Sequence, residues 1–168
     1  ETLQRHEDEE LRKNFYVRDT PLSLSEATIR TSVTELYPNI LGHMIVIAKG
    51  LNSLYDFIRP LRAKYLGKLN HVIILHPHDI PLHIWRRISI FEGILVVKGS
   101  SLEESDLRRA GIFRAGQVVV LADSSSSNSM DALTDADAIF TYHSVRRLNE
   151  KTQILIEIVR HDNVGYLD

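Results

Sequence analysis

From His43 onward, the sequence alternates between short continuous apolar runs and longer stretches with helix signals. The runs have the length of strands and are rich in β-branched residues; they occupy residues 43–49, 71–76, 94–98, 117–122 and 153–159. Strands that are apolar at every position are buried on both faces, which is typical of a parallel sheet covered by helices on each side. The pattern therefore predicts an α/β fold with a doubly wound, mostly parallel sheet.

Helices are predicted between these strands. The stretches with helical spacing are residues 51–66, 82–92, 102–110 and 129–150. Pro60 predicts a kink or break within the first stretch. The pattern Ser101–Glu104 matches a capping box, in which a serine and a glutamate satisfy each other's backbone N–H groups at a helix start.

The first 42 residues have a different pattern. Residues 1–20 are highly charged, and we expect a solvated helix or a disordered arm there. A capping box at Ser23–Glu26 and apolar residues at helical spacing predict one short helix over residues 24–37. The predicted domains are therefore an N-terminal charged and helical linker, residues 1–42, and an α/β domain, residues 43–168.

Composition excludes several classes of protein. The chain has no cysteine, which rules out a disulfide framework, a thiolate nucleophile and a cysteine zinc site. A net charge of −2 gives no support for a nucleic-acid surface. No run approaches the roughly 20 apolar residues that cross a bilayer. Because the chain begins with Glu1 and shows no signal peptide, we expect a cytosolic fragment of a longer protein.

Cofactor chemistry is poorly supported. A dinucleotide site would show Gly-x-Gly-x-x-Gly after the first strand, but only Gly50 is present, and Tyr55 stands near the position of the third glycine. The second strand ends at His76 instead of an acid that would hold ribose hydroxyls. No serine lies in a Gly-x-Ser-x-Gly elbow. We therefore expect no bound redox cofactor and no enzyme activity.

A parallel sheet places ligands at the carboxyl ends of its strands, near the switch in strand order. The loops after the strands are accordingly predicted to line a ligand-binding crevice. Its candidate residues are Gly50, Asn52, His76, Asp79, Ser100 and Asp123.

The sequence is compatible with two kinds of metal site. Asp123 and Asp131 are candidates for a hard cation such as calcium, which prefers carboxylate oxygens, although acids at a helix start also complement the helix dipole. Zinc or nickel is the second possibility, because four histidines fall in a short window. The alternative is that these are exposed loop and helix-start histidines. They are His71, His76, His78 and His83.

Several stretches together resemble a known family. Residues 54–63 (LYDFIRPLRA) are similar to the first helix of the second RCK (regulator of K⁺ conductance) domain in Slo-type potassium channels. The likeness runs from about His43 to the C-terminus, and its order and spacing are closer to the sodium-activated branch than to plain bacterial transport regulators. The other stretches that carry it are residues 99–112, 115–121, 135–138 and 154–163.

The resemblance implies a Rossmann-like domain of the RCK type on the cytoplasmic side of a multi-pass potassium channel. Such domains pair with other RCK domains of the same channel, form a gating ring, and couple ion binding to pore opening. The resemblance implies Ca²⁺ or Na⁺ as the regulatory ion, a homo-oligomer in the full channel, and no contact of this fragment with nucleic acid or membrane. It also implies an assembly surface, for which the alternative is ordinary core packing: Trp85, Ile88, Phe91, Ile139 and Phe140.

Two departures from the family pattern leave the ligand open. The run of consecutive aspartates that forms the calcium bowl is absent, and the sodium-type motif Asp-x-Arg-x-x-His has Gly111 where histidine would stand. Two other functions remain as alternatives: a dinucleotide-binding oxidoreductase-like domain, and a stand-alone regulatory subunit of a potassium transporter.

Overall fold

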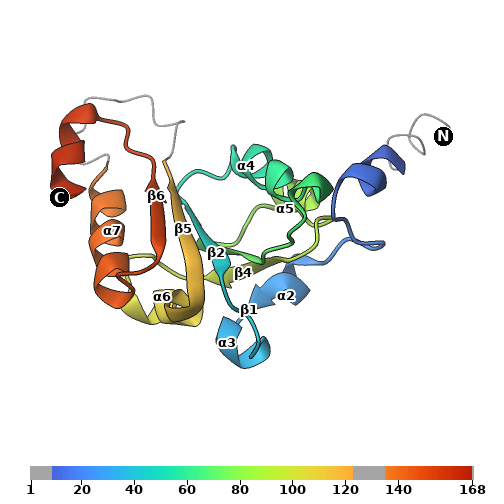
Figure 1. The fold of residues 1–168 in the computed structure, drawn as a ribbon, viewed down its shortest axis with the longest axis horizontal. Helices are drawn as coiled ribbons and strands as arrows, with labels where there is room; N and C mark the ends of the chain where they lie inside the picture. The colour runs from blue at the N-terminus through green and yellow to red at the C-terminus, as the bar shows by residue number, and fades with distance from the viewer. Residues whose placement is uncertain (1–8, 123–134, 168) are drawn as a thin grey trace.

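The computed structural model describes residues 9–122 and 135–167 and is built around one parallel sheet (Figure 1). The sheet has six strands in the order β1-β4-β3-β2-β5-β6. The strands are β1 (Thr28–Ile29), β2 (His43–Ala48), β3 (Val72–His76), β4 (Ile94–Lys98), β5 (Ala115–Leu121) and β6 (Gln153–Ile156). Every pairing between them is parallel, so the predicted fold class is confirmed.

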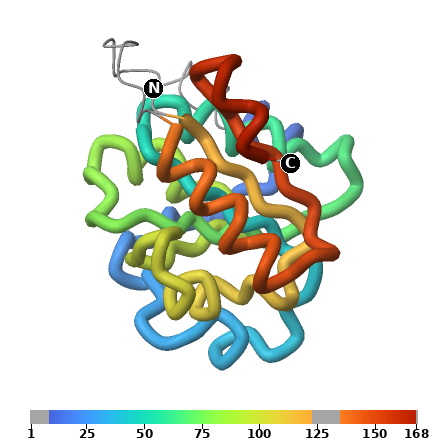
Figure 2. The backbone as a smooth tube through the Cα atoms, turned by 90° about the vertical axis from the view of Figure 1, so that its left-hand side faces the viewer, coloured from blue at the N-terminus to red at the C-terminus, as the bar shows by residue number. Residues whose placement is uncertain are grey.

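Helices cover both faces of the sheet, which explains why the central strands are apolar throughout. Helices α4 (Leu54–Leu61) and α5 (Leu82–Ile88) lie on one side of the sheet, and α6 (Glu104–Arg109) and α7 (Ala136–Leu148) lie on the other (Figure 1). Successive residues of β2 belong to opposite cores: Ile45 packs toward α6 and α7, and Val46 toward α4 and α5. Figure 2 shows α7 crossing the front of the sheet.

The predicted helices are present but shorter. Helix α4 ends one residue after Pro60, so the break occurs in its last turn, and a 3₁₀ turn, η1 (Lys64–Leu66), follows. The capping box expected at Ser101–Glu104 is wrong, because α6 begins later, with Glu103 at its N-cap. Residues 129–134 of the longest predicted helix lie outside the described residues. Two further 3₁₀ helices are η2 (Ile112–Arg114) and η3 (His161–Leu167). No helix in the described ranges combines the length and apolarity needed to cross a bilayer.

The N-terminal segment differs most from prediction. The capping box at Ser23 and Glu26 is confirmed, but the single helix expected over residues 24–37 is wrong. Two one-turn helices, α2 (Leu24–Ala27) and α3 (Val33–Leu36), are separated by β1, which pairs with the edge of β4. The β-branched pair of β1 gains backbone hydrogen bonds from the sheet that a lone helix does not offer. The domain division at residue 42 stays a prediction, although Ala27 and Val33 are fully buried in the two cores.

Residues 15–22 are also not a free arm. The backbone of Tyr16 donates to the Arg62 carbonyl at 2.8 Å and accepts from the Glu92 N–H at 3.1 Å, so this segment bridges the ends of two distant loops. The Phe15 ring packs against Phe91, with a centroid distance of 6.3 Å. Residues 9–14 are helical and mostly exposed, as expected of a solvated helix, but the expectation of a solvated helix or disordered arm is wrong at residues 15–18, where Phe15 and Val17 pack against the core.

A buried arginine, Arg62, connects two loops at the amino end of the sheet. The Arg62 side chain is 2% exposed, and its two terminal nitrogens donate to the carbonyls of Glu92 at 2.8 Å and Asn70 at 2.7 Å. Burial lowers the pKa of Arg62 to about 10, so the guanidinium remains charged at neutral pH. The side chain therefore joins the loops that lead into β3 and β4.

Replacing the Arg62 guanidinium with the single ammonium group of lysine is expected to destabilise the fold. We predict that Arg62→Lys lowers the free energy of unfolding by about 2 kcal/mol, because lysine cannot bridge both carbonyls and leaves one buried acceptor unpaired. The measurement is urea unfolding followed through the single tryptophan, Trp85. Arg86→Lys, at an exposed position on α5, is the control and should cost less than about 0.5 kcal/mol. Equal losses in the two variants would contradict the role of Arg62.

Candidate functional site

The carboxyl ends of β2, β3 and β5 surround a cavity of about 280 Å³. Strand order reverses here: the chain passes from β2 to β3 on one side, and later returns to β5 on the other side of β2. Side chains and backbone of the strand ends form its walls, together with the loop at residues 100–102 and the start of α7. The crevice predicted from the fold class is therefore present at the switch point of the sheet.

His76 forms one wall of the cavity and is 7% exposed. Its Nδ1 lies 2.9 Å from the Ala48 carbonyl oxygen. Because a carbonyl only accepts, Nδ1 carries the proton and donates it, which ties the end of β3 to the end of β2. The ring of His78 stands edge-on to that of His76 at 6.0 Å.

The four histidines considered as metal ligands do not converge. His71 precedes β3 and His76 ends it, while His83 is exposed on α5. Within the described residues, no group of three histidine, cysteine, aspartate or glutamate side chains is placed to hold a metal ion. Asp123 and Asp131, the candidates for a hard cation, lie outside the described residues.

Charged groups line the rest of the cavity. Lys49 Nζ lies 3.5 Å from an Asp137 carboxylate oxygen, which pairs the end of β2 with the first turn of α7. Glu157, just beyond β6, accepts the Ala122 N–H at 2.9 Å. Both carboxylates belong to the cavity wall, so its charged surface is predominantly acidic.

Asp135 holds the C-terminal segment against the start of α7. Its side-chain oxygens accept the backbone N–H groups of Val159 at 2.9 Å and Arg160 at 3.0 Å, and the Asn163 amide at 2.8 Å. Burial alone would raise the pKa of Asp135, but the hydrogen bonds from Asn163, Val159 and Arg160 outweigh it and hold the pKa below its ordinary value of 3.8. The carboxylate is thus ionised and fully engaged.

The loop at residues 99–101 is positioned by α6 and α7. The Ser100 N–H donates to an Asp106 carboxylate oxygen at 2.8 Å, and the Ser101 and Thr141 hydroxyls are 2.8 Å apart. A Cβ at Gly99 would lie 2.5 Å from the Asp106 carboxyl carbon, so only glycine allows this approach. Asp106 also pairs with Arg109 at 2.8 Å. The loop therefore presents its serines to the cavity at a defined position.

Two of the six predicted crevice residues, His76 and Ser100, line the cavity. Gly50 and Asn52 belong to the loop after β2 but do not line it, and Asp79 pairs instead with Lys98 at 3.0 Å. Asp123 lies outside the described residues. Sequence reasoning missed the contributions of Asp135 and Thr141 to the cavity, and no local motif marks them.

The predicted assembly surface divides into two parts. Trp85, Ile88 and Phe91 are 3%, 0% and 1% exposed, because they belong to the core that α4 and α5 form with one face of the sheet. Their assignment to a surface is therefore wrong, and the alternative of core packing holds. On α7, Phe140 is 64% exposed and Ile139 is half-buried, so this part of the predicted surface is accessible.

Comparisons with known proteins agree on one family. The family model described as "Calcium-activated potassium channel slowpoke-like RCK domain" matches residues 39–156. Over 126 residues the chain is 31% identical to potassium channel subfamily U member 1 of Macaca fascicularis. That match covers 71% of this chain but 11% of the relative, so the chain spans a small part of that protein's length.

Two solved structures share the fold. The human SLO3 gating ring matches with a TM-score of 0.76 at 22% identity, covering 92% of this chain and 28% of that one. The GsuK channel bound to NAD matches with a TM-score of 0.55 at 19% identity, covering 82% of this chain and 22% of that one.

The hydrogen bonds to Asp135 predict that substitution of this residue lowers the stability of the fold. Asp135→Asn keeps the shape but turns an amide N–H toward the backbone donors, so we expect the free energy of unfolding at pH 7 to fall by about 2 kcal/mol. The wild-type advantage is present above pH 3.8 and disappears as pH falls through the lower folded-state pKa. Urea unfolding at pH 7 and pH 3 measures both effects.

Asp137→Asn is the matched control for this experiment. The Asp137 side chain is 57% exposed, and among the described residues it pairs with Lys49 alone, so its loss should stay below about 0.5 kcal/mol. Equal effects of the two substitutions would show that Asp135 does not hold the C-terminal segment.

Proposed function

This chain belongs to the family of slowpoke-like RCK domains of calcium-activated potassium channels, and we propose that it works as a gating-ring domain on the cytoplasmic side of such a channel. The observation that carries the proposal is the family match over residues 39–156. The parallel sheet with a crevice at its switch point supports it, because this arrangement has a place for a ligand beside a helix with an exposed apolar side chain.

The proposed mechanism links the crevice to α7. Asp137 at the start of α7 pairs with Lys49 at the end of β2, and Asp135 holds the segment after β6. A ligand that binds these groups more tightly in one of two positions of α7 increases the population of that position. Because Phe140 projects from the same helix, such a shift changes the surface offered to a neighbouring RCK domain. In the channel, that change would be transmitted to the pore.

Calcium or sodium is the proposed regulatory ion, with Asp123 and Asp131, which lie outside the described residues, as its proposed ligands. The oxidoreductase alternative is less well supported by the residues in the cavity. Asp137 and Glu157 bring carboxylates to its wall, and Lys49 is already paired with one of them. A pyrophosphate would meet this negative charge without a glycine-rich loop to bind it.

Titration with a dinucleotide tests the oxidoreductase alternative. We expect the melting temperature of the chain to stay constant when NAD⁺ or NADH is added up to millimolar concentration. A ligand at a hundred times its Kd would stabilise the fold by about 2.7 kcal/mol and raise the melting temperature by several degrees. A saturable rise with either dinucleotide would therefore contradict the proposal and favour a nucleotide-binding domain.

Self-association tests the assembly surface on α7. We expect sedimentation velocity to show concentration-dependent association of the chain, because Phe140 is exposed. Phe140→Asp should weaken this association by about tenfold or more, since a buried charge replaces an apolar contact. Phe113→Asp is the control: Phe113 is 54% exposed on η2, where the Arg108 guanidinium covers its ring at 4.9 Å. Equal weakening by both substitutions, or no association at any concentration, would remove Phe140 from the interface.

A further inference from the structure

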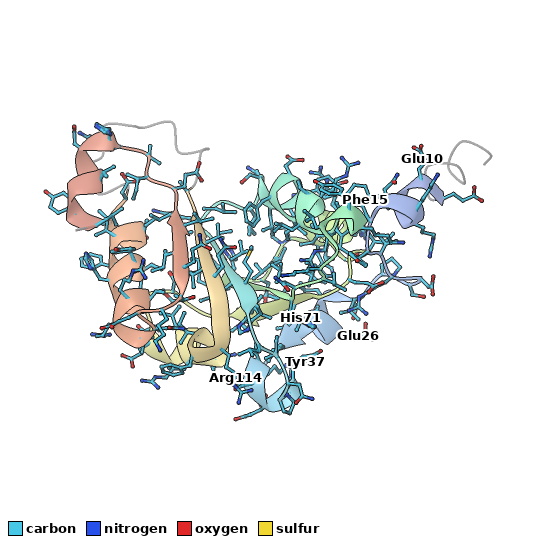
Figure 3. All side chains as sticks on the ribbon, viewed as in Figure 1. Glu10, Phe15, Glu26, Tyr37, His71 and Arg114 are labelled. Atoms are coloured by element: carbon cyan, nitrogen blue, oxygen red, sulfur yellow. The ribbon has the colours of Figure 1, made fainter. Side chains whose placement is uncertain are left out.

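The amino end of the sheet carries a second pocket, separate from the crevice. It is open and has a volume of about 510 Å³. Figure 3 shows His71 and Tyr37 close together at the lower end of the sheet, and their ring centroids are 6.0 Å apart. The pocket is lined by three segments distant in sequence: residues 17–20, Tyr37 after α3, and the loops that enter β3 and β4. The lining residues used below are Arg18, Thr20, Tyr37, His71 and Glu92.

Arg18 contributes an unsatisfied donor to this pocket. Its backbone N–H donates to the Ile90 carbonyl at 2.7 Å, which fixes the residue against the end of α5. Its side-chain Nε is buried and has no hydrogen-bond partner, and its guanidinium forms no ion pair, within residues 9–122 and 135–167. A buried donor without an acceptor is unfavourable, so an acceptor that approaches this guanidinium would stabilise it.

The charges that act on His71 are positive, although the lining also holds the carboxylates of Asp19 and Glu92. The buried guanidinium of Arg62 lies close enough to His71 to affect its protonation, as does Arg18 itself. Of the two acids at the pocket, Asp19 is neutralised by Arg12 at 2.6 Å, which leaves Glu92. Burial, Arg62 and Arg18 lower the pKa of His71, and His71 in turn contributes to the lowered pKa of the buried His43. The surroundings of His71 therefore disfavour a further positive charge.

We propose that this pocket binds a small oxyanion of the sulfate or phosphate type, with Arg18 as the main ligand and protonated His71 as a second donor. Guanidinium groups bind such anions through charge-assisted hydrogen bonds. Thr20, in the same segment as Arg18, and Tyr37, after α3, also line the pocket and carry hydroxyl groups that can donate. Several donors around an open pocket suit a tetrahedral anion better than a planar carboxylate. The site lies at the opposite end of the strands from the proposed gating crevice and does not depend on that function.

Sulfate is the probe of choice, because its charge stays constant between pH 5.5 and 7.5. Isothermal titration of the 168-residue chain at constant sodium concentration should show saturable binding. Arg18→Gln should weaken it about tenfold or more, which corresponds to the loss of one charge-assisted hydrogen bond. Arg86→Gln removes the same charge from an exposed position on α5 and should leave the affinity within about twofold. Acetate is expected to bind more weakly than sulfate.

Proton linkage provides an independent readout. An anion favours the protonated imidazole, so sulfate should raise the pKa of His71 as followed by its ring resonances in NMR spectra. By reciprocity, sulfate should bind more tightly at pH 5.5 than at pH 7.5, and His71→Gln should flatten this dependence while Arg18 still binds. The groups that face His71 are Arg18, Arg62, Tyr37, Asp19, Glu92 and His43.

The outcomes separate clearly. Wild-type affinity in Arg18→Gln, a His71 resonance that does not respond to sulfate, or preference for acetate would each overturn the oxyanion site. If Arg18→Gln does not fold, as judged by its urea unfolding curve, the His71 titration and the His71→Gln variant decide the question without it.

Discussion

The burial of the parallel sheet on both faces is the constraint on which the rest of the structure depends. Strands β2 to β5 have helices on each side, so almost every residue in their central parts must be apolar. Polar and charged side chains are thereby excluded from the middle of the sheet. They collect at the two ends of the strands, where the backbone leaves the ladder and loops supply hydrogen-bonding groups.

Different charged groups hold the two ends of the sheet. At the carboxyl end, Asp135 and Glu157 accept backbone N–H groups from other segments. At the amino end, the Arg62 guanidinium donates to carbonyls of the loops that lead into β3 and β4. His71 precedes β3 and His76 is its last residue, five positions later, or roughly 16 Å of extended chain. A small ligand at one end of the strand therefore does not contact the other end.

Part of the candidate site was predictable from strand ends alone. His76 and Ser100 follow buried strands, and both line the cavity as expected. Asp79 also follows a strand, but the chain turns at Pro77 and leads it to Lys98 instead. Asp135 was not predictable as an anchor, because two of its hydrogen-bond donors are the backbone N–H groups of residues 24 and 25 positions later. Apolar spacing marked Trp85 and Phe140 alike, although one is buried and the other exposed.

The sequence by itself determined the strands from His43 onward, their parallel arrangement with helices on both faces, and the resemblance to RCK domains. These features depend on apolar periodicity and on local motifs, which act over a few residues. Tertiary structure alone decided that residues 28–29 join the sheet, which acids line the crevice, and that Arg18 Nε has no acceptor among the described residues. Those outcomes depend on contacts between segments far apart in the chain, and neither side-chain type nor local spacing specifies such contacts.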